Sequence, residues 1–121
     1  MAVRTYQELL VWQKAMDLVV TVYKLSAQFP KEEIYGLTSQ IRRAAVSIPS
    51  NIAEGQGRGI GNEFARFLRI SQDSIQEVET QALVAERLGY VDMTDLYPLL
   101  DLSAETGRLN RGLLTSLATS N

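Results

Sequence analysis

The sequence contains neither cysteine nor histidine. Without cysteine the chain can form no disulfide and no thiolate metal site. Without these two residues it cannot build a Ser-His-Asp or Cys-His nucleophile, a zinc site of the usual type or the Glu-x-x-His motif of di-iron bundles. Because these groups make up much of the enzymatic repertoire, we expect a protein that is not an enzyme and that binds no metal and no cofactor.

Long apolar runs are also missing. The N-terminal residues MAVRTYQELL contain no continuous apolar segment with a small-residue cleavage site, and nowhere do about 18 apolar residues follow one another. We therefore expect a cytoplasmic protein that does not span a membrane. The 121 residues, of which 45% are hydrophobic and 21% charged, suffice for a single domain over residues 1–121 with one continuous core.

Apolar residues recur with helical spacing in four segments, and no alternating strand pattern competes with them. Stretches containing glycine or proline interrupt the pattern at 30–36, 55–61 and 89–94. The expected helices are 8–28, 37–54, 62–88 and one that begins near Thr94. Short connections between long helices favour antiparallel neighbours, so the sequence predicts an all-α fold, an antiparallel up-down four-helix bundle.

The first predicted helix carries two apolar stripes. It follows Thr5, whose spacing to Glu8 fits a capping box, and its stripes together span roughly 220° of the helix surface. One stripe comprises Val11, Ala15, Leu18, Val22, Leu25 and Phe29, and the other Trp12, Met16, Val19 and Tyr23. A helix that covers one core needs an apolar face of only about 100° or somewhat more, so this helix either is central or also faces another subunit.

Pro49 lies well inside the second predicted helix. A proline at this position removes the hydrogen bond to the Ala45 carbonyl and crowds it, at a cost of about 3 kcal/mol. We expect a kink at Pro49, with side chains of Ser47, Ser50 or Asn51 bonding to the backbone groups that the proline leaves without a partner.

The last two predicted helices each have a recognisable core face. In the third it comprises Phe64, Phe67, Leu68, Ser71, Ile75, Val78, Ala82 and Ala85, with Gly89 as the C-cap. In the fourth, Thr94 is the expected N-cap and Pro98 falls in the first turn. Its expected core face comprises Leu99, Leu102, Thr106, Leu109, Leu113 and Leu117.

Arginines gather in the middle of the chain. Between residues 42 and 69 there are five arginines against the two acids Glu54 and Glu63, which gives +3, whereas the remainder of the chain carries −5. The five are Arg42, Arg43, Arg58, Arg66 and Arg69. Because the planar guanidinium group suits phosphate, they are the candidate nucleic-acid-binding residues. The alternative is pairing with acids between subunits or within a helix, as the spacing of Arg69 and Asp73 allows.

The glycine-rich segment 55–61 matches neither the Walker A motif nor the dinucleotide fingerprint, since it lacks Gly-Lys-Ser/Thr and follows a helix. Its exposed amides beside Arg58 could hold one phosphate ahead of the helix that begins at Asn62. The alternative is a helix stop and a turn with positive φ at several glycines. The carboxylates Glu54, Glu77, Glu79 and Glu86 are expected to be solvated or paired rather than to bind a metal.

Three strings carry a resemblance to a known family: VWQKAMDLVVTVYKLSAQFP, YGLTSQIRRAAVSIPSNIAEGQGR and EFARFLRISQDSIQEVETQALVAERLGY. The chain resembles, over about residues 6–90, the bacterial four-helix-bundle family first noticed as open reading frames within intervening sequences of 23S ribosomal RNA genes. The middle string, in which a proline inside a helix precedes Asn-Ile-Ala-Glu-Gly, is the most specific. This resemblance implies a homopentameric ring of four-helix bundles with no established enzymatic activity.

That family is similar to the accessory protein of diversity-generating retroelements, which binds a reverse transcriptase and nucleic acid through a basic surface. The resemblance implies RNA or DNA and a reverse transcriptase or another nucleoprotein as partners, besides further copies of the chain. The alternative is a protein-interaction scaffold without nucleic-acid binding. The five arginines named above would form the corresponding basic surface.

Overall fold

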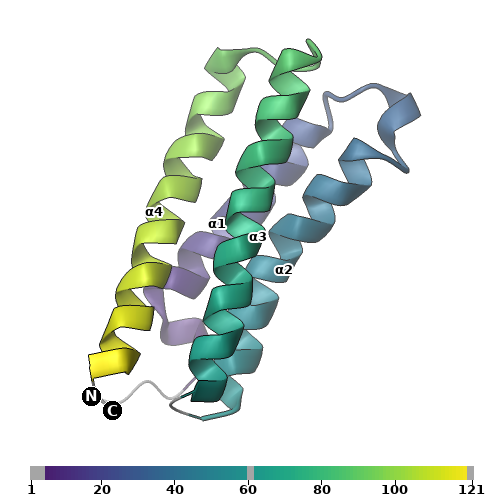
Figure 1. Ribbon diagram of the computed structural model, residues 1–121. Coiled ribbons are helices and arrows are strands. Elements are labelled where there is room, and N and C mark those ends of the chain that lie inside the picture. The colour runs from purple at the N-terminus through teal and green to yellow at the C-terminus, as the bar shows by residue number, and fades with distance from the viewer. Residues whose placement is uncertain (1–4, 60–61, 120–121) are drawn as a thin grey trace.

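The computed structural model describes residues 5–59 and 62–119, and the described part contains helices and no strand. The elements are η1 (Tyr6–Glu8), α1 (Leu10–Ser26), η2 (Lys31–Glu33), α2 (Leu37–Gly57), α3 (Asn62–Arg87) and α4 (Met93–Thr119) (Figure 1). The predicted all-α, four-helix fold is therefore confirmed. No helix in this part of the chain is long and apolar enough to cross a membrane.

The four long helices lie side by side, and in cross-section they occupy the four corners of a square (Figure 1). α1 packs against α2 and α4, and α3 packs against the same two helices, whereas the diagonal pairs do not meet in the described residues. Successive helices run in alternating directions, in agreement with the predicted antiparallel up-down order (Figure 1). We call the end where α2 finishes and α3 begins the α2–α3 end.

One apolar stripe of α1 is buried in the core and the other is not. The buried stripe comprises Val11, Ala15, Leu18, Val22 and Leu25, with Phe29 just beyond the helix. On the second stripe, Met16 is 40% exposed and Tyr23 is 42% exposed. α1 is thus a corner helix and not a central one, and its second stripe lies on the surface of the single chain.

α2 packs closely against α3 because small residues line their interface. A Cβ atom on Gly55 would lie 2.7 Å from the Cβ of Phe67, so no larger residue fits there without a shift. The Ser71 hydroxyl donates to the Ile48 carbonyl at 3.0 Å. α2 continues through Pro49, and Asn51 Nδ2 donates to the Ser47 carbonyl at 2.8 Å. Pro49 frees the Ala45 carbonyl, whereas Asn51 bonds to that of Ser47, so the predicted bond to the freed group and the kink both stay predictions.

The glycines show where the predicted helix ends were right and where they were wrong. α2 ends at Gly57 and not at Glu54, because Gly55 is buried against α3 and continues the helix. The expectation of positive φ at several glycines is wrong for Gly55 and Gly57; in this segment only Gly59, at 103°, has it among the described residues. Gly89, with φ of 80°, caps α3 as predicted, since the Tyr90 amide donates to the Ala85 carbonyl at 2.9 Å.

Two predicted helix starts need correction. The Thr5 hydroxyl accepts a hydrogen bond from the Gln7 amide at 3.2 Å, but it caps the short η1 turn, and α1 begins only at Leu10. α4 begins at Met93, because the Asp92 carboxylate accepts the Asp95 amide at 2.9 Å and so takes the capping role expected of Thr94.

The predicted core face of α4 is also partly wrong. The residues that are buried are Leu96, Leu99, Ser103, Thr106, Gly107 and Asn110. The remaining predicted positions, Leu102, Leu109, Leu113 and Leu117, pack only at the edge of the core. Polar side chains can occupy the centre here because α3 supplies partners: Ser103 donates to Glu79 at 2.8 Å, and Asn110 donates to the Leu68 carbonyl at 2.8 Å.

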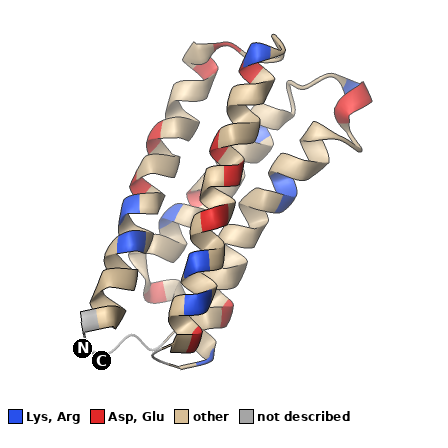
Figure 2. Cartoon of the chain, in the orientation of Figure 1, with Lys and Arg blue, Asp and Glu red and all other residues tan. Residues whose placement is uncertain are grey.

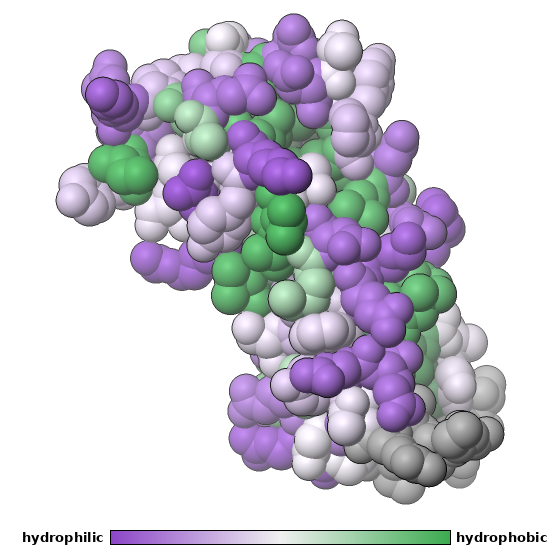
Figure 3. Space-filling model, turned by 180° about the vertical axis from the view of Figure 1, so that it is seen from behind, coloured by the Kyte–Doolittle hydropathy of each residue, from purple (hydrophilic) through white to green (hydrophobic). Residues whose placement is uncertain are grey.

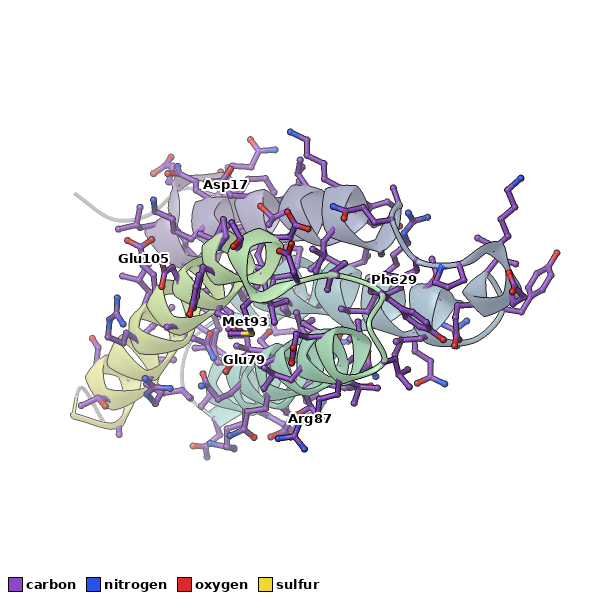
Figure 4. The ribbon with its side chains drawn as sticks, turned by 90° about the horizontal axis from the view of Figure 1, so that it is seen from above. Asp17, Phe29, Glu79, Arg87, Met93 and Glu105 are labelled. Atoms are coloured by element: carbon purple, nitrogen blue, oxygen red, sulfur yellow. The ribbon has the colours of Figure 1, made fainter. Side chains whose placement is uncertain are left out.

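A hydrogen-bonded carboxylate joins the two connections at the other end of the bundle. Glu33 accepts the Leu37 amide at 2.9 Å and the Tyr90 hydroxyl at 2.7 Å. Phe29 packs against Tyr90 with ring centroids 5.8 Å apart, and Figure 4 shows its position beside the turn that follows α3. The bond from the Leu37 amide, and then that from Tyr90, lower the pKa of Glu33, so the ionised carboxylate is the form that holds α2 to this turn.

Replacing Glu33 should reduce stability in a pH-dependent way. Because the pKa of Glu33 is lower in the folded chain, its contribution is present above the unfolded-state pKa, near 4.3, and is lost as the pH falls through the folded-state value. The difference in unfolding free energy between the wild type and Glu33→Gln should therefore be larger at pH 7 than at about pH 3.5. Urea unfolding at both pH values measures it, with the exposed Glu32→Gln as control; an equal difference at both would contradict the prediction.

Gly55 should not tolerate even a methyl group. Gly55→Ala places a Cβ 2.7 Å from Phe67 Cβ and 3.3 Å from the Phe64 carbonyl oxygen, so we expect destabilisation by about 1–3 kcal/mol despite the better helix propensity of alanine. Gly57→Ala is the matched control, because nothing lies within 4 Å of its Cβ position. It should be neutral or stabilising by up to about 1 kcal/mol in the same urea titration. Equal effects of the two substitutions would refute the close approach.

Candidate functional site

The five candidate arginines do not form one cluster. Arg42 and Arg43 lie in the first half of α2, whereas Arg58 follows its last residue. With a rise of about 1.5 Å per residue, Arg42 and Arg58 are about 24 Å apart along the helix. Arg66 and Arg69 lie near the start of α3. The structure therefore brings Arg58 and Arg66 together at the α2–α3 end and leaves Arg42 and Arg43 apart.

Arg42 is engaged within the fold. Its Nε donates to the Ser26 hydroxyl at 2.8 Å and its Nη2 donates to the Tyr23 carbonyl at 3.3 Å. Its Cζ atom also lies 4.5 Å from the centre of the Tyr23 ring. Ser26 is the last residue of α1, so Arg42 caps the carboxyl end of that helix, where a positive charge is favourable. Arg43 next to it is exposed and only reaches the Ser39 hydroxyl, at 3.5 Å.

Arg58 and Arg66 share one aromatic ring. Their Cζ atoms lie 5.3 and 4.7 Å from the centre of the Phe67 ring. Each also pairs with an acid of its own segment: Arg58 Nη2 lies 3.0 Å from Glu54 Oε2 and Arg66 Nε lies 3.5 Å from Glu63 Oε2. Such exposed pairs contribute only about 0–1 kcal/mol, so a phosphate group can compete for these guanidinium groups.

Arg69 behaves differently, because it has no ion pair in the described chain, not even with Asp73. It lies on the side of α3 toward α4, where it lines a groove of about 390 Å³ together with Leu114 and Thr115. The opposite wall therefore belongs to the C-terminal part of α4.

Sequence reasoning missed two arginines on α4, Arg108 and Arg111. Asn110, between them, bonds to the Leu68 carbonyl and to Gln72, so this part of α4 lies level with the start of α3. Arg66, Arg69, Arg108 and Arg111 therefore lie at about the same level of α3 and α4, and we call them the basic end. The signal was present in the sequence, since residues 106–121 contain both arginines and no acid.

The other half of α3 and α4 is rich in acids. Its carboxylates are Asp73, Glu77, Glu79 and Glu86 on α3 and Asp95, Asp101 and Glu105 on α4. Figure 2 shows the separation along both helices, with blue segments toward the α2–α3 end and most red segments beyond them. Among the described residues no group of acidic side chains could hold a metal ion. Beyond the basic end, the described parts of α3 and α4 carry one further arginine, Arg87, near the end of α3.

The segment 55–61 does not offer the free amides expected of a phosphate loop. Gly55 and Gly57 belong to α2, and the Arg58 and Gly59 amides donate to the Glu54 and Gln56 carbonyls at 3.2 Å. Residues 60–61 lie outside the described residues. The phosphate-loop hypothesis is therefore wrong for the part that the structure describes.

A second surface lies on the opposite side of the bundle. Between α1 and α2 an apolar groove of about 330 Å³ is lined mainly by Trp12, Met16, Val19, Val46, Pro49 and Ala53, which we call the apolar face. Figure 3 shows this side, where hydrophobic residues form a band with hydrophilic residues around it. Trp12 is held in place by the edge of Tyr6, with ring centroids 5.3 Å apart. This face contains the stripe of α1 that the core leaves uncovered.

With one basic end and one apolar face, the described chain belongs to the class of small all-α four-helix bundles. The sequence model of the 23S rRNA-intervening sequence protein family matches residues 7–112, so the chain belongs to that family. This confirms the family resemblance, while the relation to the retroelement accessory protein stays a prediction. No curated protein matches the chain.

Proposed function

We propose that this chain is a non-enzymatic, homo-oligomeric accessory protein of the cytoplasm that binds RNA, DNA or a ribonucleoprotein. The observation that carries the proposal is the basic end: residues 62–72 of α3 and 106–119 of α4 carry Arg66, Arg69, Arg108 and Arg111 and a single acid, Glu63. Arg58 adjoins this end through the Phe67 ring. Arginines from two helices at one level make a surface that a phosphate backbone can follow.

The overall charge of −2 restricts where a polyanion can bind. Acidic residues cover the far half of α3 and α4 and repel phosphates, so a nucleic acid is held at the α2–α3 end and in a limited range of orientations. A reverse transcriptase or another nucleoprotein, the partner implied by the retroelement resemblance, would add contacts outside this end.

The proposed oligomer uses the apolar face. Met16 is 40% exposed and Val46 is 41% exposed, and they line the same groove between α1 and α2. A continuous apolar surface of this kind is typical of a protein–protein contact. We propose that a second copy of the chain covers it, in the ring of five that the family resemblance implies.

Nucleic-acid binding should depend on salt and on the arginines beside Phe67. We expect the affinity for a labelled single-stranded RNA or DNA, measured by fluorescence anisotropy, to fall with salt at a log-log slope of about −0.7 per phosphate contact. The double variant Arg58→Glu with Arg66→Glu should weaken binding without changing the oligomer mass. Lys31→Glu with Arg87→Glu is the charge-matched control; Figure 4 shows Arg87 on the outer side of α3. Absence of binding at low salt would refute the proposal.

Assembly should depend on the apolar face and not on exposed apolar side chains elsewhere on the surface. Val46→Glu should dissociate the oligomer, because the charge would lie in the proposed subunit contact. Val84→Glu, on α3, is the matched control, since both valines are 41% exposed. Light scattering measures the mass, and circular dichroism checks that the helices remain. Folded wild-type monomers at micromolar concentration would contradict the proposal.

One observation favours the second candidate, a protein-interaction scaffold without nucleic-acid binding. Arg58 and Arg66 are paired with Glu54 and Glu63, and Arg42 is engaged by α1, so three of the five candidate arginines already have partners within the chain. If the arginines of the scaffold also pair between subunits, reversing Arg43 or Arg66 should lower the oligomer mass, and no salt-dependent RNA binding would be seen.

A further inference from the structure

A polar groove of about 310 Å³ runs between α3 and α4. α3 contributes Gln72, Gln76 and Glu79 to its wall, and α4 contributes Ser103, Gly107, Arg108 and Arg111. Gly107 lies in the middle of α4 and is buried. A Cβ atom there would lie 3.3 Å from Arg111 Nη1 and 3.5 Å from Gln72 Nε2, so both nitrogens approach the same point beside this glycine.

A buried asparagine fixes which way the Gln72 amide points. Asn110 is fully buried and its Nδ2 donates to the Leu68 carbonyl at 2.8 Å. Because a backbone carbonyl can only accept, this atom must be the nitrogen. The same Nδ2 donates to Gln72 at 2.9 Å, so the Gln72 atom that faces it must be the oxygen. The NH2 group of Gln72 is therefore directed to the other side, beside Gly107.

These donors have no acceptor in the described part of the chain. No hydrogen bond from Gln72 Nε2 to a protein atom exists there, and neither Arg111 nor Arg108 has an ion pair. The nearest carboxylate of the groove is Glu79, whose Oε1 accepts the Ser103 hydroxyl at 2.8 Å. Figure 4 shows Glu79 on the side of α3 toward α4. Seven residues, or about 10 Å, separate it from Gln72 along α3.

We propose that the Gly107 end of this groove is a phosphate subsite of the nucleic-acid surface. One phosphate oxygen accepts hydrogen bonds from Gln72 Nε2 and Arg111 Nη1, and Arg108 adds positive charge at the rim. Charge-assisted bonds from a guanidinium group and a pre-oriented amide are suited to an anion. This inference rests on the proposed function, from which the phosphate comes as part of an RNA or DNA backbone; a free nucleotide is the other source of the same group.

Gly107 gives the inference a test that separates binding from stability. Glycine inside a helix is less favourable than alanine, so Gly107→Ala should raise the melting temperature. The added Cβ would meet the flexible end of Arg111 and the Gln72 amide, and it would occupy the point on which they converge. We expect RNA affinity to fall several-fold in a protein that melts no lower than the wild type. A variant that melts higher and binds RNA as the wild type does would overturn the subsite.

Arg111→Gln provides the second test, with Arg87→Gln as the matched control. Fluorescence anisotropy with a labelled single-stranded RNA should show about tenfold weaker binding for Arg111→Gln and a salt slope smaller by about 0.7, while Arg87→Gln binds as the wild type does. If the wild type does not bind RNA at low salt, the proposed function fails. If it binds and Arg111→Gln equals Arg87→Gln, only the subsite fails.

Nuclear magnetic resonance identifies the source of the phosphate. The side-chain NH2 resonances of Gln72 should shift when the full chain is titrated with RNA, and the shift should be absent in Arg111→Gln. Uridine monophosphate that shifts them and displaces RNA supports the same subsite with a free nucleotide as a competing ligand. An acidic peptide that produces the same shifts and displaces RNA equally well would overturn the assignment to phosphate.

Discussion

The close packing of α2 against α3 is the contact on which the bundle and its arginine surface depend. It requires the absence of a side chain at Gly55, beside the Cβ of Phe67. Because Phe67 is anchored there, its ring lies between the end of α2 and the start of α3, and Arg58 and Arg66 both lie over it. The same approach lets Ser71 of α3 bond to the Ile48 carbonyl next to Pro49. The position of two candidate arginines therefore follows from one glycine in the core.

The sequence predicted helices well where local periodicity decides and poorly where distant partners decide. The core face of α3 was predicted correctly because its apolar spacing is continuous from Phe64 to Ala85. The end of α2 was predicted too early. The low helix propensity of Gly55 can be read from the sequence, whereas its burial against α3, which keeps it in the helix, depends on residues distant in the chain. On α4, Ser103 and Asn110 entered the core because Glu79 and the Leu68 carbonyl, at least 24 residues away, accept their hydrogen bonds.

The candidate site was predictable in composition and not in arrangement. The sequence alone showed that arginines are concentrated between residues 42 and 69. It did not show that Arg42 bonds to Ser26 and Tyr23, because only the fold defines the path of the connection between α1 and α2. Arg108 and Arg111 lay outside the window of highest charge, and the antiparallel pairing of α3 with α4 brings them level with Arg69. A count of charges along the chain cannot show that these arginines lie level with one another, because it treats residues about 40 positions apart as unrelated. The lack of acids after Glu105 was the available signal.

The square arrangement of the helices links the two proposed surfaces. Since α1 and α3 are diagonal, as are α2 and α4, the apolar face on α1 and α2 lies opposite the groove on α3 and α4. A subunit contact made by the apolar face therefore does not itself involve the basic end of the same copy. In the proposed oligomer, one nucleic-acid strand that reached several basic ends would bind with an avidity that exceeds the affinity of a single end, without any new contact. Under the two proposals, this avidity would allow a chain with net negative charge to hold a polyanion through a few arginines per copy.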